Sequence, residues 1–488
     1  MATSWPEVIV EPPGDVRAEV AVIGSGPGGA VTACLLAEAG RDVVLVEEGP
    51  LLALESAPAF SSIEMRQKYR NGGITVALGA PNVNYAEGRC VGGGSEVNSG
   101  LYHRTPPEIL DRWRHDFGLA HSSATDLEPH FAACEQDVSV SYLPGRAPAA
   151  SLKLHQGAQH LGWSSLEVPR WYRYAPDGGG QGVKQTMSKT FVPRATGAGC
   201  RLLPDTRVAR VGYADGRWTL RCDPARPGRG GSSFTIRAHT VFVAGGAIQT
   251  PALLRRSGIK HNVGNSLRMH PTVKVVARFD DVVNAADMGV PVHQVKEFAP
   301  HLSFGCSISA LPHLALAMTD HPEHITEVRE QWPHLAVYYA MSDGGAGRIR
   351  TVPAYRDPLV SFALDERDLE LLADGLEKLC RCLLAAGATA LYPSIRGCPP
   401  VFCEADLVKL PRPLPRDRSS LMTIHCFSSC PMGESRARTA TDSLGRVHDA
   451  IGLHIADGSL LCGAPGVNPQ GSIMALARRN ALAFLDHG

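Results

Sequence analysis

The chain has 488 residues and carries 48 Lys and Arg against 48 Asp and Glu, so its formal net charge at pH 7 is zero. A balanced charge creates no basic field, and we expect neither a nucleic-acid partner nor an anionic membrane surface. No apolar run reaches the roughly 18 residues of a transmembrane helix, and the length favours two domains.

The N-terminus and the cysteines both indicate the cytoplasm. Residues 1–19 contain acids and prolines and lack the apolar core of a secretory signal. Thirteen cysteines are scattered along the chain and do not form the paired C-x-x-C sets of a zinc site. We therefore expect a cytoplasmic protein with reduced, mostly buried thiols and no metal site.

Residues 20–50 are typical of a dinucleotide-binding strand–turn–helix–strand unit. Val20–Ile23 is a continuous apolar run, as in a strand buried on both faces. Three glycines follow in G-x-G-x-x-G spacing: Gly24, Gly26 and Gly29. The first permits a tight turn, the second a close approach to a pyrophosphate, and the third close packing of the helix on the strand.

The rest of this unit fits the same interpretation. A helix from about 28 to 39 would present its N-terminal amides and dipole to the phosphates, and Gly40 is placed to end it. Val43–Val46 is the second strand, and Glu47 directly after it can accept hydrogen bonds from ribose hydroxyls. The sequence therefore predicts a bound dinucleotide here.

Two glycine-rich turns lie further along the chain. Gly88–Pro106 cannot be regular helix or strand throughout, so we expect a loop that wraps the rest of the cofactor. Thr240–Ile259 has the pattern of a buried strand, two glycines and an amphipathic helix, without a full second fingerprint.

Residues 273–418 have a different pattern, which predicts an inserted antiparallel sheet. Alternating stretches stand at Val273–Phe279, Leu335–Met341 and Leu359–Leu364. Ser342–Arg348 is interpreted as a connection between two strands of that sheet. Asp365 begins a predicted helix with leucines at 3-4-3-4 spacing, which ends at Gly387 and whose leucines form core.

The end of the chain returns to the nucleotide-binding pattern. Leu453–Ala456 is a predicted strand, Asp457–Gly458 a turn with exposed amides, and Ser472–Leu485 a helix. A first strand and a last helix that belong to one domain fit a doubly wound α/β fold.

Four separated blocks together resemble the glucose–methanol–choline (GMC) oxidoreductases, which are FAD-dependent alcohol oxidases and dehydrogenases. The blocks are the fingerprint with Glu47, GRCVGGGSEVN, AGGAIQTPALLRRSGI with VGNSLRMHP, and the C-terminal H…CPMG…ADGSLL…GVNPQGSIMALARRNA. The last block is most similar to the branch of long-chain alcohol oxidases and cholesterol-oxidase-like enzymes.

The resemblance implies an α/β fold (α+β overall), in which a Rossmann-like FAD-binding domain carries an inserted antiparallel-sheet substrate domain. The implied FAD-binding segments are 15–106, 195–272 and 425–488. The implied substrate-binding segments are 107–194 and 273–424.

The resemblance also implies roles for residues at matching positions. The cofactor-binding residues would be Gly24, Gly26, Gly29, Glu47, Gly93, Gly94, Asn98, Val208, Asp457, Gly458 and Asn468. Val97 stands where members with histidine-linked FAD carry that histidine, so we expect non-covalent FAD. Pro431 replaces an arginine that is usual after the active-site histidine, and we have no interpretation of that difference.

His425 matches the active-site base and Asn468 its partner. The resemblance implies oxidation of an alcohol to the carbonyl by hydride transfer to flavin N5, with His425 accepting the hydroxyl proton and Asn468 orienting the oxygen. An ordinary histidine pKa of about 6.5 suits a base near neutral pH. O₂, a quinone or another carrier would reoxidise the flavin. His270 and His103 are interpreted as structural.

Other functions stay open at this point. A non-redox, FAD-containing lyase similar to the hydroxynitrile lyases has the same fold, and so would a binding flavoprotein. An NAD(P)H-linked reductase is disfavoured because a second fingerprint is missing. The expected pocket-lining stretches, Ala299–Ser309 and His334–Met341, are mostly apolar, which favours a hydrophobic or bulky small-molecule alcohol. The sequence leaves the oligomeric state open.

Overall fold

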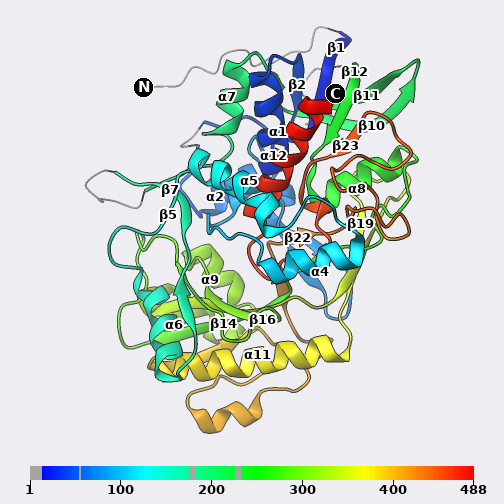
Figure 1. Ribbon diagram of the computed structural model, residues 1–488. Coiled ribbons are helices and arrows are strands. Elements are labelled where there is room, and N and C mark those ends of the chain that lie inside the picture. The colour runs from blue at the N-terminus through cyan, green and yellow to red at the C-terminus, as the bar shows by residue number, and fades with distance from the viewer. Residues whose placement is uncertain (1–13, 54–55, 176–181, 226–231, 488) are drawn as a thin grey trace.

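The computed structural model describes residues 14–53, 56–175, 182–225 and 232–487. Two main sheets organise this part of the chain, and they lie one above the other in Figure 1. The first is a 7-stranded sheet of order β10-β11-β12-β1-β2-β9, with β23 paired to β12. Its strands are β1 (Val16–Ile23), β2 (Val43–Val46), β9 (Arg201–Leu203), β10 (Thr206–Ala214), β11 (Arg217–Pro224), β12 (Phe234–Val243) and β23 (Leu453–Ile455).

The centre of the first sheet is parallel and buried on both faces. β1 pairs in parallel with β2 and with β12, and every residue of Val20–Ile23 is buried. Helix α1 (Pro27–Glu38) packs beside the C-terminal helix α12 (Gln470–His487), so the first and the last α-helix of the described residues lie side by side (Figure 1). Gly40 follows α1 with φ +78°, a conformation that disfavours side chains and ends the helix. The predicted strand–turn–helix–strand unit is confirmed.

The second is a 9-stranded, largely antiparallel sheet of order β3-β4-β21-β14-β17-β16-β15-β6, with β20 paired to β14. Its strands are β3 (Thr75–Ala77), β4 (Val83–Tyr85), β6 (Ser165–Glu167), β14 (Thr272–Phe279), β15 (His293–Val295), β16 (Leu302–Cys306), β17 (Leu335–Ser342), β20 (Ala388–Pro393) and β21 (Leu421–Thr423). Figure 1 shows helix α11 (Glu366–Ala385) crossing beneath it. The mixed α/β fold class is thereby confirmed.

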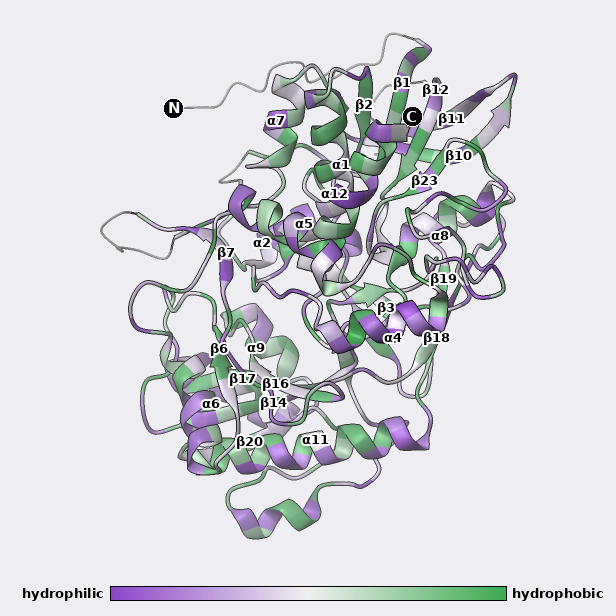
Figure 2. Ribbon diagram, viewed as in Figure 1, coloured by the Kyte–Doolittle hydropathy of each residue, from purple (hydrophilic) through white to green (hydrophobic). Residues whose placement is uncertain are grey.

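Helix α11 forms as its sequence predicts. Asp365 accepts a hydrogen bond from the amide of Asp368, whose side chain accepts one from the amide of Asp365. The leucine stripe is buried against the sheet, whereas polar residues alternate with it along the outer surface (Figure 2). Gly387, with φ +86°, follows the C-cap residue Ala386.

The segment after β17 differs from its prediction. The connection covers only residues 343–345, because β18 (Ala346–Arg350) begins there and pairs with β19 (Leu359–Ala363). These two strands form a separate two-stranded sheet, so Leu359–Leu364 does not join the large sheet as expected. The alternation in this stretch correctly indicated a strand, but alternation does not identify a strand's partner.

The other elements connect or cover the two sheets. The remaining helices are α2 (Ser62–Lys68), α3 (Gly94–Val97), α4 (Pro107–Phe117), α5 (Ala124–Asp137), α6 (Ala149–His160), α7 (Phe191–Gly197), α8 (Gly246–Arg256), α9 (Leu311–Ala317) and α10 (Ile325–Glu330). The remaining strands are β5 (Val140–Ser141), β7 (Arg170–Arg173), β8 (Val183–Lys184), β13 (Arg268–Met269) and β22 (Cys426–Phe427). Within the predicted loop at 88–106, Gly94–Val97 is one helical turn.

The division into two domains stays a proposal, and the packing suggests changes to it. Ile109, Trp113 and Phe131 belong to the hydrophobic core around β1, and α5 packs on α12. This places 107–138 with the first sheet. Conversely, β3 and β4 pair into the second sheet although they precede residue 106.

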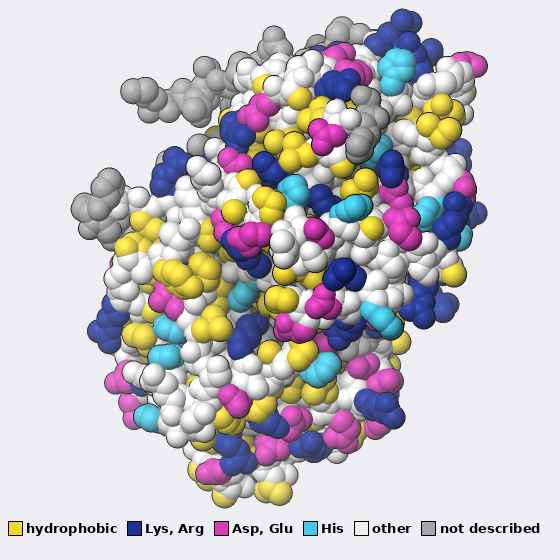
Figure 3. All heavy atoms as spheres, viewed as in Figure 1, with side chains coloured by type: hydrophobic (Ala, Val, Ile, Leu, Met, Phe, Trp, Pro, Cys, Tyr) yellow, Lys and Arg dark blue, Asp and Glu magenta, His cyan; other side chains and the backbone are white. Residues whose placement is uncertain are grey.

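The surface agrees with the balanced composition. Figure 3 shows basic and acidic side chains interspersed over the visible face. Among the helices in the described ranges, none is both long and apolar enough to cross a bilayer. Residues 1–13 lie outside the described residues, so the expectations about the N-terminus and the cytoplasm stay predictions.

Candidate active site and cofactor cavity

One cavity beside the first sheet brings together nearly all of the predicted site residues. Those that line it are Gly24, Gly26, Glu47, Gly93, Gly94, Asn98, Val208, His425, Asp457, Gly458 and Asn468. They come from six separated parts of the chain, including the fingerprint turn after β1, the glycine-rich loop at 88–106 and the C-terminal segment. Gly29 is the predicted residue that does not line it.

Glycines of the fingerprint turn after β1 and of the 88–106 loop together form a backbone cradle, which side chains at these positions would fill. Gly24 has φ +102°, and a Cβ there would lie 2.3 Å from the Ala244 carbonyl oxygen. A Cβ on Gly93, whose φ is +54°, would lie 2.8 Å from the Cα of Gly26. The cradle stands at the N-terminus of α1, which has no acidic residue in its first turn. Its amides and dipole suit a pyrophosphate.

Gly29 has the packing role that its place in the fingerprint predicts. A Cβ at this position would lie 1.9 Å from the carbonyl oxygen of Gly24 and 2.9 Å from the Cβ of Ala244. Its contribution to a bound pyrophosphate is therefore indirect: it lets α1 approach β1 and β12 closely enough to aim its N-terminus.

Glu47 is buried behind the first glycine turn and is already largely engaged. One carboxylate oxygen accepts from the Ser25 amide at 3.0 Å and the Ser25 hydroxyl at 2.7 Å, and the other accepts from the Gly49 amide at 2.8 Å. Burial raises the pKa of this carboxyl despite these bonds. A carboxylate accepts about four hydrogen bonds, so one position is left for a ribose hydroxyl.

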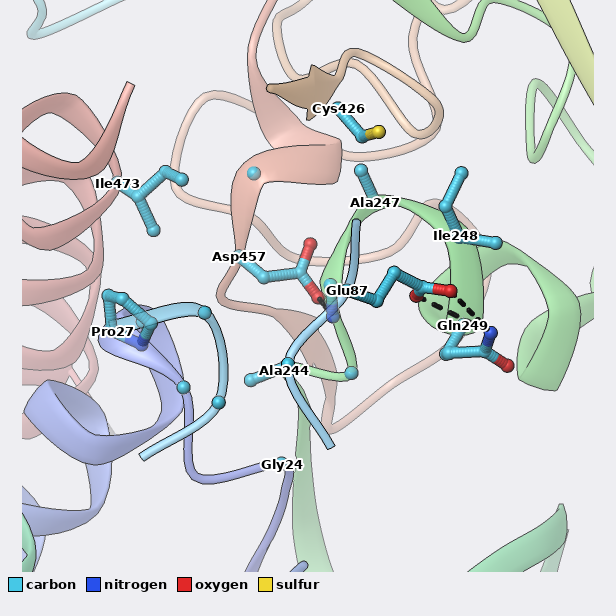
Figure 4. Close-up of a pocket in the computed structure, with 18 of the residues that line it drawn as sticks. Gly24, Pro27, Glu87, Ala244, Ala247, Ile248, Gln249, Cys426, Asp457 and Ile473 are labelled. Carbon is cyan, nitrogen blue, oxygen red and sulfur yellow. Dashed lines mark hydrogen bonds between the residues drawn. The ribbon is translucent and has the colours of Figure 1, made fainter. Parts of the chain in front are cut away.

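Asp457 connects the C-terminal turn to the turn between β12 and α8. Its carboxylate accepts from the amides of Gly246, at 2.9 Å, and Ser459, at 2.8 Å, and from the Thr250 hydroxyl. Figure 4 shows this side chain between the two turns, near Ala244. Because the carboxylate is used inside the protein, the backbone of this turn is what it offers to a cofactor.

Sequence reasoning missed an ion-pair network that contributes Glu48, Arg70 and Arg207 to the cavity wall. Glu48 pairs with Arg70 at 2.9 Å and Arg356 at 2.7 Å, and lies within 4.0 Å of Arg89 and Arg207. Burial alone would raise its pKa, but these guanidinium groups hold the pKa at about 2. The two adjacent acids after β2 were visible in the sequence, whereas the arginines come from distant segments.

His425 also lines this cavity and lies between two polar partners. Its Nε2 is 3.2 Å from Nδ2 of Asn468, and its Nδ1 is 3.0 Å from Nδ1 of His270. The two imidazole rings meet edge to face at 83°. His270 therefore contacts the predicted base directly, although the sequence indicated only a structural role for it.

The hydrogen bonds around Asn468 determine which nitrogen of His425 carries the ring proton. Nε2 of Gln294 donates to Oδ1 of Asn468 at 3.3 Å, and Oε1 of Gln294 faces Nε2 of His103 at 3.2 Å. Asn468 then directs its amide hydrogens toward His425, which makes Nε2 of His425 an acceptor. The proton of the ring lies on Nδ1, facing His270. Gln294 was not among the predicted residues.

Burial keeps these histidines neutral. It lowers the pKa of His425 to about 4, with a further contribution from the positive charge of Lys296. Burial and the same charge lower the pKa of His103 to about 3, and burial, His425 and Lys296 place the pKa of His270 well below its ordinary value. A neutral His425 with a free lone pair on Nε2 can accept a proton at neutral pH.

The glycine-rich loop at 88–106 is held in place by the side chains of Asn98 and Lys184. Asn98 donates to Oε1 of Gln470 at 2.7 Å and accepts from the Gly100 amide at 3.1 Å. The ammonium of Lys184 donates to the carbonyls of Glu96, at 3.2 Å, and Asn98, at 2.7 Å.

The stretches that we expected to line the pocket, 299–309 and 334–341, contribute nothing to this cavity's wall. In the described ranges no group of His, Cys, Asp or Glu could hold a metal ion.

Comparison with known proteins agrees with this geometry. Two models described as GMC oxidoreductase match residues 65–272 and 345–477, and a model of an NAD(P)-binding Rossmann-like domain matches 22–80. An uncharacterised GMC-type oxidoreductase of Sinorhizobium fredii, y4nJ, is 38% identical over 97% of this chain and 95% of its own. A long-chain-alcohol oxidase of Arabidopsis thaliana, FAO3, is 24% identical over 95% of this chain and 67% of its own.

Solved structures share the fold. Pyridoxine 4-oxidase from Mesorbium loti superposes with a TM-score of 0.72 at 18% identity, over 96% of this chain and 100% of that one. A formate oxidase superposes with a TM-score of 0.73 at 14% identity, over 98% and 99%. The near full-length similarity at 38% identity and the two matching models lead to one conclusion: the chain belongs to the GMC oxidoreductase family.

Proposed function

We propose that this protein oxidises the CH–OH group of a small-molecule alcohol to a carbonyl, with FAD as its cofactor and His425 as the base. The observation that carries the proposal is the pair of contacts made by the His425 ring: the Asn468 amide faces Nε2, and His270 faces Nδ1. Family membership implies FAD, and the glycine cradle and the α1 N-terminus fit its pyrophosphate. Bound FAD supplies the hydride acceptor.

The proposed roles follow from the hydrogen bonds. The alcohol hydroxyl replaces Asn468 as the donor to Nε2 of His425, which then takes the hydroxyl proton. Nδ2 of Asn468, released from the imidazole, donates to the alcohol oxygen and orients it. His270 accepts from Nδ1–H of His425 and so holds the tautomer and stabilises the imidazolium that forms. Gln294 fixes the orientation of the Asn468 amide.

FAD is proposed to bind without a covalent link to the 97–98 segment. Val97 lines the cavity beside Asn98 and offers no nucleophilic atom. Oxidation of a long-chain alcohol is the activity named for FAO3, and a hydrophobic or bulky alcohol is therefore the first class to test. O₂ and quinones are the acceptors to compare.

The test is to mix the purified holoenzyme with aliphatic, aromatic, sterol and sugar alcohols without oxygen and to follow the flavin absorbance. Bleaching by one class is expected, and admitting air or a quinone then separates an oxidase from a dehydrogenase. If no alcohol bleaches the flavin while cyanohydrins are cleaved to aldehydes, the protein is a lyase and the redox proposal fails. A protein that binds no FAD contradicts both.

A further inference from the structure

Lys296 places a positive charge beside the proposed active site, and the mechanism above does not use it. It directly follows β15 and stands two residues after Gln294. Its amide donates to the Ser164 carbonyl at 3.0 Å, which continues the pairing with β6 by one residue, so the two side chains project from the same face. Gln294 contacts Asn468 on that face. The charge of Lys296 lowers the pKa of His425, His270 and His103, so the ammonium lies near all three rings.

This ammonium is buried and has no partner. Its Nζ is inaccessible to solvent, and no atom of the described residues accepts a hydrogen bond from it. Burial lowers its pKa to about 8, and no carboxylate offsets that effect. The nearby titratable groups are the three histidines, which are neutral at pH 7, and Tyr339, whose pKa burial raises to about 12. An uncompensated buried charge is unfavourable, and proteins rarely retain one without a partner.

The sheet face around Lys296 carries polar side chains. Gln294 and Tyr339 lie in register on either side of Gly305, and Gln294 bonds to the Tyr339 phenol. A Cβ on Gly305 would lie 2.3 Å from the phenol oxygen, so glycine there leaves room for the ring. The face that points toward His425 and Asn468 thus offers hydrogen-bonding groups and the unpartnered ammonium of Lys296.

We propose that Lys296 binds a carboxylate of the substrate, so that the alcohol oxidised at His425 is a hydroxy acid. This inference rests on the proposed function and names its substrate class. A carboxylate is favoured over a phosphate ester because a single ammonium faces this side, with no arginine among the groups that act on it. Phosphate sites usually combine several donors. An apolar body with a carboxylate at one end also keeps the apolar character expected of the substrate.

Binding of carboxylates that cannot be oxidised tests Lys296 without relying on turnover. Holoenzyme is titrated with acetate, hexanoate and benzoate and with the corresponding neutral amides, and the flavin absorbance shift gives each Kd. We expect wild type to bind the best carboxylate at least tenfold more tightly than its amide. Lys296→Met should bind both equally, and Lys296→Arg should retain the preference. Removing a charged hydrogen bond typically costs about 1.5–3 kcal/mol, or roughly tenfold to 150-fold in Kd.

Controls distinguish this binding role from a merely structural one. Lys260→Met removes an exposed ammonium and should leave every Kd unchanged. In wild type, the carboxylate preference should decline as pH rises through about 8, because the ammonium loses its proton, while amide binding stays constant. Equal binding of acid and amide by wild type, or a preference that survives in Lys296→Met, overturns the proposal. Inorganic phosphate binding more tightly than any carboxylate also overturns it. Failure of every alcohol, hydroxy acids included, to bleach the flavin would contradict the proposed function, whereas a carboxylate preference that depends on Lys296 would still establish the carboxylate site.

Discussion

At the scale of single residues, His425 determines the expected pH dependence. Its pKa is lowered to about 4, mainly by burial, and a base must be deprotonated to act. The rate of anaerobic flavin reduction should therefore be constant around neutral pH and fall as pH decreases through about 4. Lys296→Met removes a nearby positive charge, so the acid limb should move to higher pH. Stopped-flow reduction across pH measures both.

Substitution of His425, the proposed base, gives the corresponding rate effect. His425→Asn should slow flavin reduction by about 10²–10⁴-fold, the usual loss for general base removal. His293→Asn is the matched control: His293 is also buried with a pKa lowered to about 4, but it bonds to Ser151 of α6 on the other face of β15. Equal losses in both variants would show that the effect is structural and would exclude His425 as the base.

Gly93 is expected to be required for flavin binding. Alanine there would adopt φ +54° and place its Cβ 2.8 Å from the Cα of Gly26, so the two turns would have to separate. Gly93→Ala should retain substantially less FAD than wild type, measured as the flavin-to-protein absorbance ratio after gel filtration. Gly197→Ala is the control, since Gly197 is exposed on α7 and does not line the cavity, a Cβ there meets nothing within 4 Å, and its φ is ordinary. Equal FAD content in the two variants would contradict the cradle.

At the scale of elements, α11 supports the second sheet through its leucine stripe. Leu376 is fully buried in the core shared with β14 and β17. Leu376→Ala should lower the free energy of unfolding by about 2–5 kcal/mol, because a cavity remains. Arg367→Ala, on the exposed side of the same helix, should change it by less than about 0.5 kcal/mol. Urea denaturation followed by circular dichroism compares them, and equal values would contradict the assigned core face.

The elements also show where sequence reasoning succeeds. Local signals were sufficient for β1, α1 and α11, because strand burial, the capping residue Asp365 and helix-ending glycines all lie within a short stretch. They were insufficient for β18 and β19, since pairing depends on which strand edge is free after folding. The boundary near residue 107 has the same origin: α4 and α5 are amphipathic, and amphipathicity does not indicate which sheet they cover.

At the scale of the whole molecule, the site divides into a predictable and an unpredictable part. The glycines, Asp457, His425 and Asn468 stand in blocks that resemble a family, so their convergence on one cavity could be anticipated. Gln294 stands on β15 and Lys296 directly after it, in a stretch without a motif. Only the pairing of the second sheet and its position over His425 place them at the site. The sequence alone therefore does not indicate that Gln294 and Lys296 lie near His425.

The cavity also connects flavin binding to the stability of the whole chain. Its wall is assembled from segments between Ile23 and Ile473, so a bound cofactor contacts parts of the chain that meet only in the folded state. Because FAD binds the native state and not the unfolded one, FAD at 100 times its Kd should add about 2.7 kcal/mol to the free energy of unfolding. Apoprotein should therefore melt at a lower temperature than holoenzyme, and Gly93→Ala should reduce the difference.

Since Val97 offers no atom for a covalent link to FAD, acid precipitation of the holoenzyme should release all the flavin into the supernatant. A pellet that stays yellow would instead require a covalent bond from another cavity residue, and peptide mapping would identify it.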